Sequence, residues 1–480
     1  MCASDPGKRL VRITALLACL LPALALSAPA GQGGKPSVNG KLVAAGRLPA
    51  DTVDFLGDTL GSFSSLAVVR GSWHRTGNGY EGVLWTLPDR GRNDPEAGVF
   101  YDYPARLERM RIGLADGKVS LTPQGGIELR DFDGRPFTGA DPGTGTLQQR
   151  EHILPSPATG VGAGKVSLDA ESLAFTADGH FYVGDEYAAN VYYFDAQGRL
   201  QGIIEPPAAI VPKRDGEPAF GSLKAPQQGR RNNQGIEALD LSPDGRHLIV
   251  ALQSALVQDT AKGDASGRVN TRVLVYDVAE NPLPRSPIGH YVVALPAYRH
   301  DGGAGPADRT AAQSELRALD AHRFLLLARD GNGLGASSDD APVFKQVLLV
   351  DVAGATNLAG TPYETSASSV LARADGTALR EGITPATWTS RVDLLDAAQL
   401  SRFGLGLDRR DPQLALLSEK WEAMDLVPAL DPRHPHDWFL LVGNDNDFIA
   451  RHCVMRGDSC DSPIDNDNRV LVYRLTLPER

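Results

Sequence analysis

Cysteine is scarce in this sequence, and long hydrophobic runs are absent from most of it. Of the four cysteines in 480 residues, two lie within the first 30. Beyond that segment, no apolar run reaches the roughly 18 residues typical of a membrane-spanning helix. The motifs G-x-S-x-G, G-x-x-x-x-G-K-[ST] and H-E-x-x-H are also missing. These absences argue against a standard α/β-hydrolase, a P-loop nucleotidase and a zincin metalloprotease.

The N-terminal segment has the features of a secretory signal peptide. Residues 8–12 carry three positive charges, residues 13–26 are apolar, and residues 28–30 read Ala-Pro-Ala. This order predicts cleavage near residue 30 and export to the periplasm or the medium. A lipoprotein signal ending at Cys19 is the alternative, and it is less favoured because the apolar run continues past that cysteine. We expect residues 31–480 to form a single domain.

The mature chain is acidic. Residues 1–30 hold three Lys or Arg and one Asp, so 45 basic and 58 acidic residues remain, a net charge of −13. An acidic surface argues against nucleic acid and anionic lipid as partners, and it suits solubility or cation binding. We expect a monomer without a transmembrane segment that acts on a small molecule.

The two cysteines of the mature chain predict one disulfide. Cys453 and Cys460 are seven residues apart, and an exported protein meets an oxidising compartment. A loop this short predicts a stabilisation at the low end of the usual range. Two free thiols are the alternative. A zinc site is disfavoured because no paired histidines lie nearby.

The chain repeats itself. Four stretches share a glutamate, an alternating strand, a turn and a second apolar strand with a polar end, and Asp-Gly turns of this kind indicate hairpins. The stretches begin with Asp169-Ala-Glu171-Ser-Leu, Gly235-Ile-Glu237-Ala-Leu, Gln313-Ser-Glu315-Leu-Arg and Lys420-Trp-Glu422-Ala-Met.

Repeated four-stranded units predict an all-β fold, a β-propeller of six blades with long loops on one face. A degenerate copy covers residues 63–112, and a weak unit lies within residues 113–165. Seven blades remain open if residues 36–56 and 360–400 contribute strands. A two-sheet sandwich would explain the alternation but not the recurring glutamate. A short helix is expected at about residues 392–403, with Ser390 as its cap.

The antiparallel hairpins place acidic side chains together. The first strand of each hairpin begins where the second ends, and ring closure brings these ends to one mouth. Oxygen ligands in such a cluster favour Ca²⁺. The predicted metal ligands are Glu171, Asp185, Glu186, Glu237, Glu315, Glu422 and Asp445. Two alternatives stay open: each glutamate caps its own blade by bonding backbone or a neighbouring arginine, or the carboxylates do direct acid–base work.

Basic side chains share the same face. Calcium with arginines nearby would seat a phosphate ester. The predicted phosphate contacts are Arg90, Arg92, Arg230, Arg231 and Lys420, and no residue is singled out as catalytic.

At these residues the sequence resembles a known family. The stretches Asp169-Ala-Glu171-Ser-Leu, Asn233-Gln-Gly-Ile-Glu237-Ala-Leu, Leu87-Pro-Asp89-Arg90-Gly91 and Lys420-Trp-Glu422-Ala-Met resemble the bacterial phytase-like domain family, which is described as having esterase-like activity of phytase. The resemblance covers about residues 45–475, and it implies a propeller, export and a phosphoesterase role. The expected function is calcium-dependent phosphoric-ester hydrolysis. The alternatives are a propeller that binds a ligand or partner without turnover, and a lactone or carboxylic-ester hydrolase.

Overall fold

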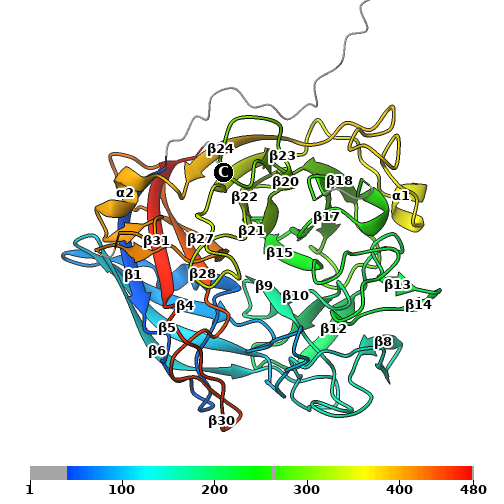
Figure 1. The fold of residues 1–480 in the computed structure, drawn as a ribbon, viewed down its shortest axis with the longest axis horizontal. Coiled ribbons are helices and arrows are strands. Elements are labelled where there is room, and N and C mark those ends of the chain that lie inside the picture. Colours follow the sequence, from blue (N-terminus) through cyan, green and yellow to red (C-terminus); the bar gives the residue numbers. More distant parts are fainter. Residues whose placement is uncertain (1–39, 262–264, 412, 478–480) are drawn as a thin grey trace, which may run out of the picture.

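Strands arranged as a ring dominate the protein (Figure 1). The computed structural model describes residues 40–261, 265–411 and 413–477, so the predicted signal peptide lies outside the described residues. Five innermost strands contact one another in a closed cycle, in the order β2, β9, β15, β21, β27 and back to β2. Each of them is the inner edge of a four-stranded antiparallel sheet, which is called a blade below.

The blades follow the chain in order. Blade one contains β2 (Ser65–Val68), β4 (Gly79–Leu87), β5 (Arg106–Ala115) and β6 (Lys118–Glu128). Blade two contains β9 (Ala170–Phe175), β10 (Phe181–Asp185), β11 (Val191–Phe194) and β12 (Leu200–Ile204). Blade three contains β15 (Ile236–Leu241), β16 (His247–Leu252), β17 (Asn270–Asp277) and β18 (Gly289–Ala294). Blade four contains β21 (Ala312–Ala318), β22 (Arg323–Arg329), β23 (Lys345–Asp351) and β24 (Thr387–Asp393). Blade five contains β27 (Lys420–Pro428), β28 (Asp437–Asp445), β31 (Asn468–Thr476) and β1 (Lys41–Leu48).

The two ends of the chain close the ring. The first strand, β1, pairs antiparallel with the last, β31, and the two lie side by side in Figure 1 as blue and red arrows. On its other edge β1 meets β6 of blade one at a single parallel pair, Ala45 with Lys118. Strands from both ends of the chain therefore hold blade five together and join it to blade one.

Short elements fill the connections. They are η1 (Arg70–Ser72), β3 (His74–Arg75), β7 (Thr146–Gln149), β8 (His152–Pro155), β13 (Lys213–Arg214), β14 (Glu217–Pro218), η2 (Val257–Asp259), β19 (Ala297–Tyr298), β20 (Arg309–Thr310), α1 (Pro362–Thr365), α2 (Ala397–Ser401), β25 (Leu405–Gly406), β26 (Ala415–Leu416), β29 (Val454–Met455) and β30 (Asp458–Ser459). Neither of the described α-helices has the length or the apolar character needed to cross a bilayer.

The β-propeller prediction is confirmed, but the expected six blades are wrong for the described residues, which form five. The weak unit expected within residues 113–165 is not a blade. Its first part forms β6, the outer strand of blade one, and residues 146–155 form the separate β7–β8 hairpin. The alternation of residues 119–129 was therefore that of an edge strand.

The predicted helix at residues 392–403 is shorter than expected. Residues 387–393 form β24, the outer strand of blade four, and the helix covers only Ala397–Ser401. Asp396 caps this helix by accepting hydrogen bonds from the amides of Ala398 and Gln399, so the expected cap at Ser390 is wrong. An aspartate immediately before the first turn is the better cap because its carboxylate reaches the free amides.

The hydrophobic core lies between neighbouring blades. Leu239, Leu248 and Val250 of blade three pack with Tyr182 and Val191 of blade two. The opposite face of blade three packs Ile249 and Ala251 on blade four. Since both faces of such a blade are covered, strands like β16 read as nearly continuous apolar runs.

The close contact between the first and last blades predicts that one glycine cannot be replaced without a loss of stability. A Cβ at Gly46 of β1 would lie 2.2 Å from the carbonyl oxygen of Val119 in β6. We expect Gly46→Ala to lower the free energy of unfolding by about 1–3 kcal/mol, because the backbone of one blade would have to move. Urea denaturation measures this change.

The control is Gly71→Ala, since a Cβ at Gly71 meets nothing within 4 Å. We expect this exposed substitution to stay within about 0.5 kcal/mol of wild type. Equal stabilities of the two variants would contradict the closure of the ring through β1 and β6.

Candidate functional site

A β-bulge recurs at the start of four inner strands. In each hairpin one residue of the inner strand has no partner on the second strand, and the register shifts by one around it. The unpaired residue is Glu171 in β9, Glu237 in β15 and Glu422 in β27. In β21 it is Ser314. A bulge re-aims a side chain, and here it does so at the same end of successive blades.

The three bulge glutamates join other carboxylates in a buried group. We call this group the acidic cluster, and its members are Asp89, Asp169, Glu171, Glu186, Glu237, Glu422, Asp445 and Asp447. Seven of the eight are no more than 7% exposed, and the side chain of Asp447 is 26% exposed. Among the described residues, the cations that form ion pairs with the cluster are Arg90, Arg329 and Lys420, and Arg92 and Arg230 also lie near it. Negative charge therefore exceeds positive charge in a region with little water.

Burial and the excess of negative charge raise the pKa values of several carboxyl groups in the cluster. Burial, and then the neighbouring Asp169, raise the pKa of Asp89 to about 7. Burial also raises the pKa of Asp169 to about 7, against the opposing effect of Arg90. Burial and Asp447 raise the pKa of Asp445 well above its ordinary value. Each carboxylate disfavours the ionisation of its neighbours, as expected for like charges in one site.

Glu171 has the least compensated carboxylate of the cluster. It is 7% exposed, and no hydrogen bond or ion pair joins it to another described residue. Burial raises its pKa well above the ordinary value, and so do Glu237, Asp169 and Asp89, which carry the same sign. Close by, the Oε1 atom of Glu186 is buried without a hydrogen-bond partner among the described residues. Among the described residues, Glu171 thus has no ion-pair partner, and Glu186 keeps one buried oxygen without a hydrogen bond, although Arg90 and Arg230 lie near it.

A close backbone contact brings Glu186 and Glu237 together. Gly235 approaches the loop after β10 so closely that a Cβ there would lie 2.3 Å from the carbonyl oxygen of Glu186. Two residues later comes Glu237, whose pKa is raised by burial and by Glu186. The glycine of the Asn-Gln-Gly-Ile-Glu stretch therefore allows blades two and three to place carboxylates side by side.

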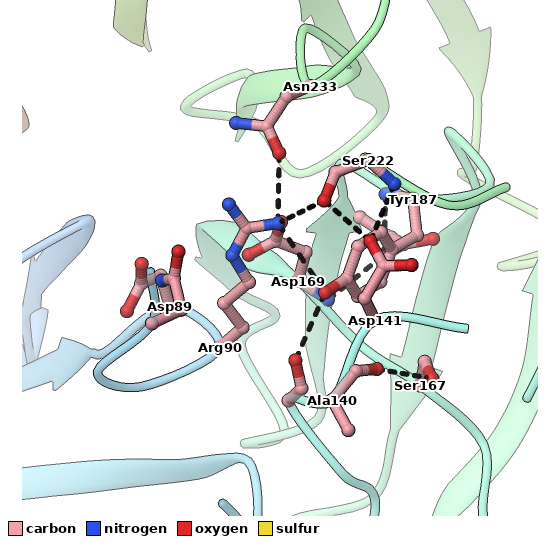
Figure 2. Close-up of polar contacts among 12 residues, drawn as sticks. Asp89, Arg90, Ala140, Asp141, Ser167, Asp169, Tyr187, Ser222 and Asn233 are labelled. Carbon is pink, nitrogen blue, oxygen red and sulfur yellow. Dashed lines mark hydrogen bonds and ion pairs between the residues drawn. The ribbon is translucent and has the colours of Figure 1, made fainter. Parts of the chain in front are cut away.

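Arg90 is held in a fixed position beside Asp169. Its Nη1 atom lies 2.9 Å from Oδ2 of Asp169 and donates to Oδ1 of Asn233 at 2.9 Å. Longer hydrogen bonds reach Tyr187 and Ser222, both at 3.4 Å (Figure 2). Asp89 precedes it in the turn after β4, where the Oδ1 atom accepts from Ser62 and from the amide of Gly91. Arg90 therefore neutralises Asp169 and leaves Glu171 uncompensated.

Lys420 neutralises the other side of the cluster. Its ammonium lies 2.6 Å from Oδ1 of Asp447 and 3.7 Å from Oδ2 of Asp445. The pairing of β27 with β28 causes this contact, because Lys420 lies opposite Asp445 in the register. Burial disfavours the ammonium, but Asp447 and Asp445 hold the pKa of Lys420 well above its ordinary value.

Arg329 connects blades four and five. Its guanidinium forms a buried ion pair with Glu422 and donates from Nε to the hydroxyl of Ser314 at 3.0 Å. Burial opposes the ionisation of Glu422, but Arg329 and Lys420 outweigh it and keep the pKa of Glu422 below its ordinary value. The serine bulge of β21 thus holds the cation that neutralises the glutamate bulge of β27.

Two predicted ligands lie outside this arrangement. Glu315 follows the bulge, accepts from Ser65 at 2.6 Å and pairs with Arg317 at 3.2 Å, so its charge is already balanced. Asp185 accepts hydrogen bonds from the amides of Asp169, Tyr187 and Ala188. It therefore closes the turn after β10, and burial raises its pKa to about 7. The alternative in which an acidic side chain stabilises its blade through backbone or arginine contacts fits both residues.

The predicted phosphate contacts also differ in how far their charges are already engaged by other groups. Arg230 is buried, and its guanidinium donates to the carbonyl oxygens of Tyr187 and Phe220. Arg92 is half-buried and donates to the carbonyl oxygen of Asp447 at 3.5 Å. Arg231 donates to Gln234 and Thr260 and has no carboxylate partner among the described residues. Burial and the neighbouring Arg268 lower the pKa of Arg231 to about 10.

The predicted disulfide is confirmed. Cys453 and Cys460 are bonded, with their Cα atoms 4.8 Å apart. The bridge lies in the loop between β28 and β31, beside Ala50 and Ala450.

Sequence reasoning missed four residues of the site as ligands or partners. They are Asp89, Asp169, Asp447 and Arg329. Asp169 and Asp447 each lie two residues along the sequence from a predicted ligand. Asp89 adjoins a predicted phosphate contact, and Arg329 is the last residue of β22. Proximity in sequence to a predicted residue was therefore the available signal. The contact of Arg329 with Glu422 gives no such signal, because it depends on the bulges.

The cluster contains two groups of three carboxylates that could hold a cation. One is Asp89, Asp169 and Glu171, and the other is Asp89, Asp445 and Asp447. Within each group, one oxygen per residue lies within 4.8 Å of the others. Oxygen-only donor sets of this kind suit hard cations such as Ca²⁺. The uncompensated Glu171 makes the first group fit a divalent cation.

Fold and site together define a class: a β-propeller with a buried carboxylate cluster at the starts of its inner strands. A family model described as "Phytase-like: Esterase-like activity of phytase" matches residues 59–448. The chain belongs to this phytase-like family. The matched region begins before β2 and extends past β28, so it includes all members of the acidic cluster.

A curated relative and several solved structures are also similar. A protein of Arthroderma benhamiae (strain ATCC MYA-4681 / CBS 112371), described as an uncharacterized secreted protein, is 32% identical over 453 residues, which cover 85% of this chain and 87% of the relative. This relative is fungal, so the restriction of the resemblance to bacteria is not supported.

The similar solved structures are distant. The WD40 β-propeller domain of Doa1 is 10% identical, with a TM-score of 0.27, over 90% of this chain and 96% of that one. Hsv2 of Kluyvelomyces marxianus is 9% identical, with a TM-score of 0.24, over 58% and 76%. At these scores the propeller assignment depends on the strand pairing described above.

The raised carboxyl pKa values predict how stability depends on pH when divalent ions are chelated. Asp89 and Asp169 have folded-state pKa values of about 7, above the unfolded values of about 4. The native state therefore binds more protons than the unfolded state, and this contribution to stability is lost as pH rises through 7. We expect the melting temperature in excess chelator to fall between pH 6.5 and pH 8.

The matched variant is Asp89→Asn, which can still accept from Ser62 but cannot ionise. Its melting temperature should fall less steeply over the same range. Glu422, whose pKa is lowered, loses its contribution only in more acidic solution and leaves this window unchanged. A wild-type melting temperature that rises from pH 6.5 to pH 8 would contradict the crowding of the carboxylates.

Proposed function

We propose that the protein is an exported, calcium-dependent phosphoric-ester hydrolase. The observation that carries the proposal is Glu171, a buried carboxylate without an ion-pair or hydrogen-bond partner among the described residues, in one group with Asp89 and Asp169. A divalent cation there would balance charge that the described residues leave unbalanced. The family description, which names an esterase-like activity of phytase, supports a phosphate ester as substrate.

The residues proposed to hold the ion are Asp89, Asp169 and Glu171, with Glu186 and Glu237 as neighbouring oxygen donors. Calcium takes six to eight oxygen ligands at flexible geometry, so a crowded carboxylate site suits it better than the strict octahedron of magnesium. When bound, the ion would neutralise phosphate charge and lower the pKa of a coordinated water. Arg90 holds Asp169 in place for this role and favours its ionised form, against the burial that raises its pKa to about 7.

The substrate anion needs cations that are not already committed. Arg90, Arg230 and Lys420 are engaged by Asp169, by carbonyl oxygens and by Asp447, respectively. Arg231 is not paired with an acid among the described residues, and Arg92 makes only a long bond of 3.5 Å to a carbonyl. We therefore propose Arg92 and Arg231 as the phosphate contacts, because a guanidinium matches a phosphate with two parallel hydrogen bonds.

Export is supported by two observations. The sequence predicts a signal peptide, and the fungal relative is described as secreted. A disulfide in the mature chain is consistent with an oxidising compartment.

The test is turnover of phosphate esters by the purified protein with calcium. We expect hydrolysis of phytate or p-nitrophenyl phosphate that stops in excess chelator and returns with calcium. Glu171→Gln should lower kcat/KM by at least about 100-fold, in the range seen when a group that stabilises the transition state is removed. The exposed Glu280→Gln, in the connection between β17 and β18, should leave kcat/KM unchanged.

The same assay separates the alternatives. Turnover of p-nitrophenyl acetate or a sugar lactone, without turnover of phosphate esters, would show a carboxylic-ester or lactone hydrolase instead. No turnover of any of these substrates between pH 5 and pH 9, with several divalent ions, would favour a propeller that only binds.

A further inference from the structure

The two carboxylate groups of the cluster share one residue but differ in their neighbours. Asp89 belongs to both, and each group adds two further acids within 4.8 Å. Judged by carboxylates alone, the site would hold two divalent cations bridged by Asp89. Cations of the chain itself decide how many of these positions remain open.

In the second group, an ammonium already contacts two of the three carboxylates. Nζ of Lys420 is 2.6 Å from Asp447 and 3.7 Å from Asp445. Its position is fixed by the pairing of β27 with β28, and the nearby Glu422 and Glu419 also favour its charged form. A divalent ion between Asp445 and Asp447 would have to share their oxygens with this ammonium.

In the first group, the described part of the chain supplies a cation to only one of the three carboxylates. Arg90 contacts Asp169 from the side of Asn233 and Tyr187, where its guanidinium is held by hydrogen bonds (Figure 2). Neither Glu171 nor Asp89 has an ion-pair partner among the described residues. The first group therefore keeps two carboxylates without a cation, and the second keeps one, the shared Asp89.

We propose that the ammonium of Lys420 is a built-in second cation, so that the cluster binds one divalent ion, at Asp89, Asp169 and Glu171, instead of two. This inference rests on the proposed metal site and specifies its stoichiometry. It also gives Lys420 a positioning role: by holding Asp445 and Asp447, it leaves Asp89 to the ion. The earlier prediction of Lys420 as a phosphate contact is replaced by this role in the proposal.

The test is the number of calcium ions bound per chain, measured by calorimetric titration and equilibrium dialysis. Wild type should bind one. Lys420→Met removes the charge but keeps much of the length and apolar stem, and this variant should bind two. Glu171→Gln with Lys420 intact should lose the single ion. Lys420→Arg, which keeps the charge, should bind one, as in wild type.

Each outcome decides a separate point. Two ions on wild type, or one ion on a folded Lys420→Met, would overturn the inference and leave the metal-dependent function standing. No calcium on wild type would overturn the proposed function as well. If Lys420→Met does not fold without calcium, wild type and Glu171→Gln still decide, because an ion that survives Glu171→Gln is bound elsewhere and contradicts the assignment.

Discussion

Repulsion between buried like charges is the constraint on which the site depends. Closing five inner strands into a ring brings the starts of blades two, three and five together, and each carries a glutamate there. In a region of low dielectric constant, carboxylates at this spacing must be protonated, paired or bound to a cation. Arg90, Arg329 and Lys420 each answer this requirement for part of the cluster. What they leave, around Glu171, is the part that can bind something from solution.

The β-bulge is the local device that creates this constraint. In a regular strand, the glutamate would alternate with its neighbours and face one side of the blade. The extra residue interrupts that alternation, so Glu171, Glu237 and Glu422 turn toward the cluster while the following residues return to the core. In β21 the bulge falls on Ser314, and Glu315 returns to the regular part of the strand, where it pairs with Arg317. A shift of one residue therefore separates a cluster position from a structural ion pair.

Much of the fold could be predicted from the sequence, because hairpins and apolar runs are local signals. The turns at Gly179 and Gly245, the inner and second strands of blades two to five, and the disulfide all follow from short stretches of sequence. The number of blades could not be obtained in this way for two reasons. Strand β1 pairs with β31 across almost the whole length of the chain, and the apolar alternation of β6 resembles that of a strand in a separate unit. Strand β24 was missed because its residues, Thr387–Asp393, belong to no visible repeat.

The site was predictable to the extent that it follows the repeat. Glu171, Glu186, Glu237, Glu422 and Asp445 lie in the acidic cluster as the hairpin geometry indicated. Glu315 and Asp185 do not belong to it. Aligning the repeats by residue type shows neither the bulge that precedes Glu315 nor the amides that bind Asp185 in the turn after β10. The pairing of Lys420 with Asp447, and of Arg329 with Glu422, depends on contacts between strands or blades. Such contacts appear only once the ring is assembled.

The central claim is the proposal that the folded protein binds a divalent cation at Glu171, and the most direct measurement is the melting temperature with and without calcium at pH 8. If the ion binds only the folded state, free calcium at about 100 times its dissociation constant should stabilise the fold by about 2.7 kcal/mol. Chelation should therefore lower the melting temperature, calcium should restore it, and Glu171→Gln should abolish most of the difference. A melting temperature that responds to neither chelator nor calcium would contradict the account.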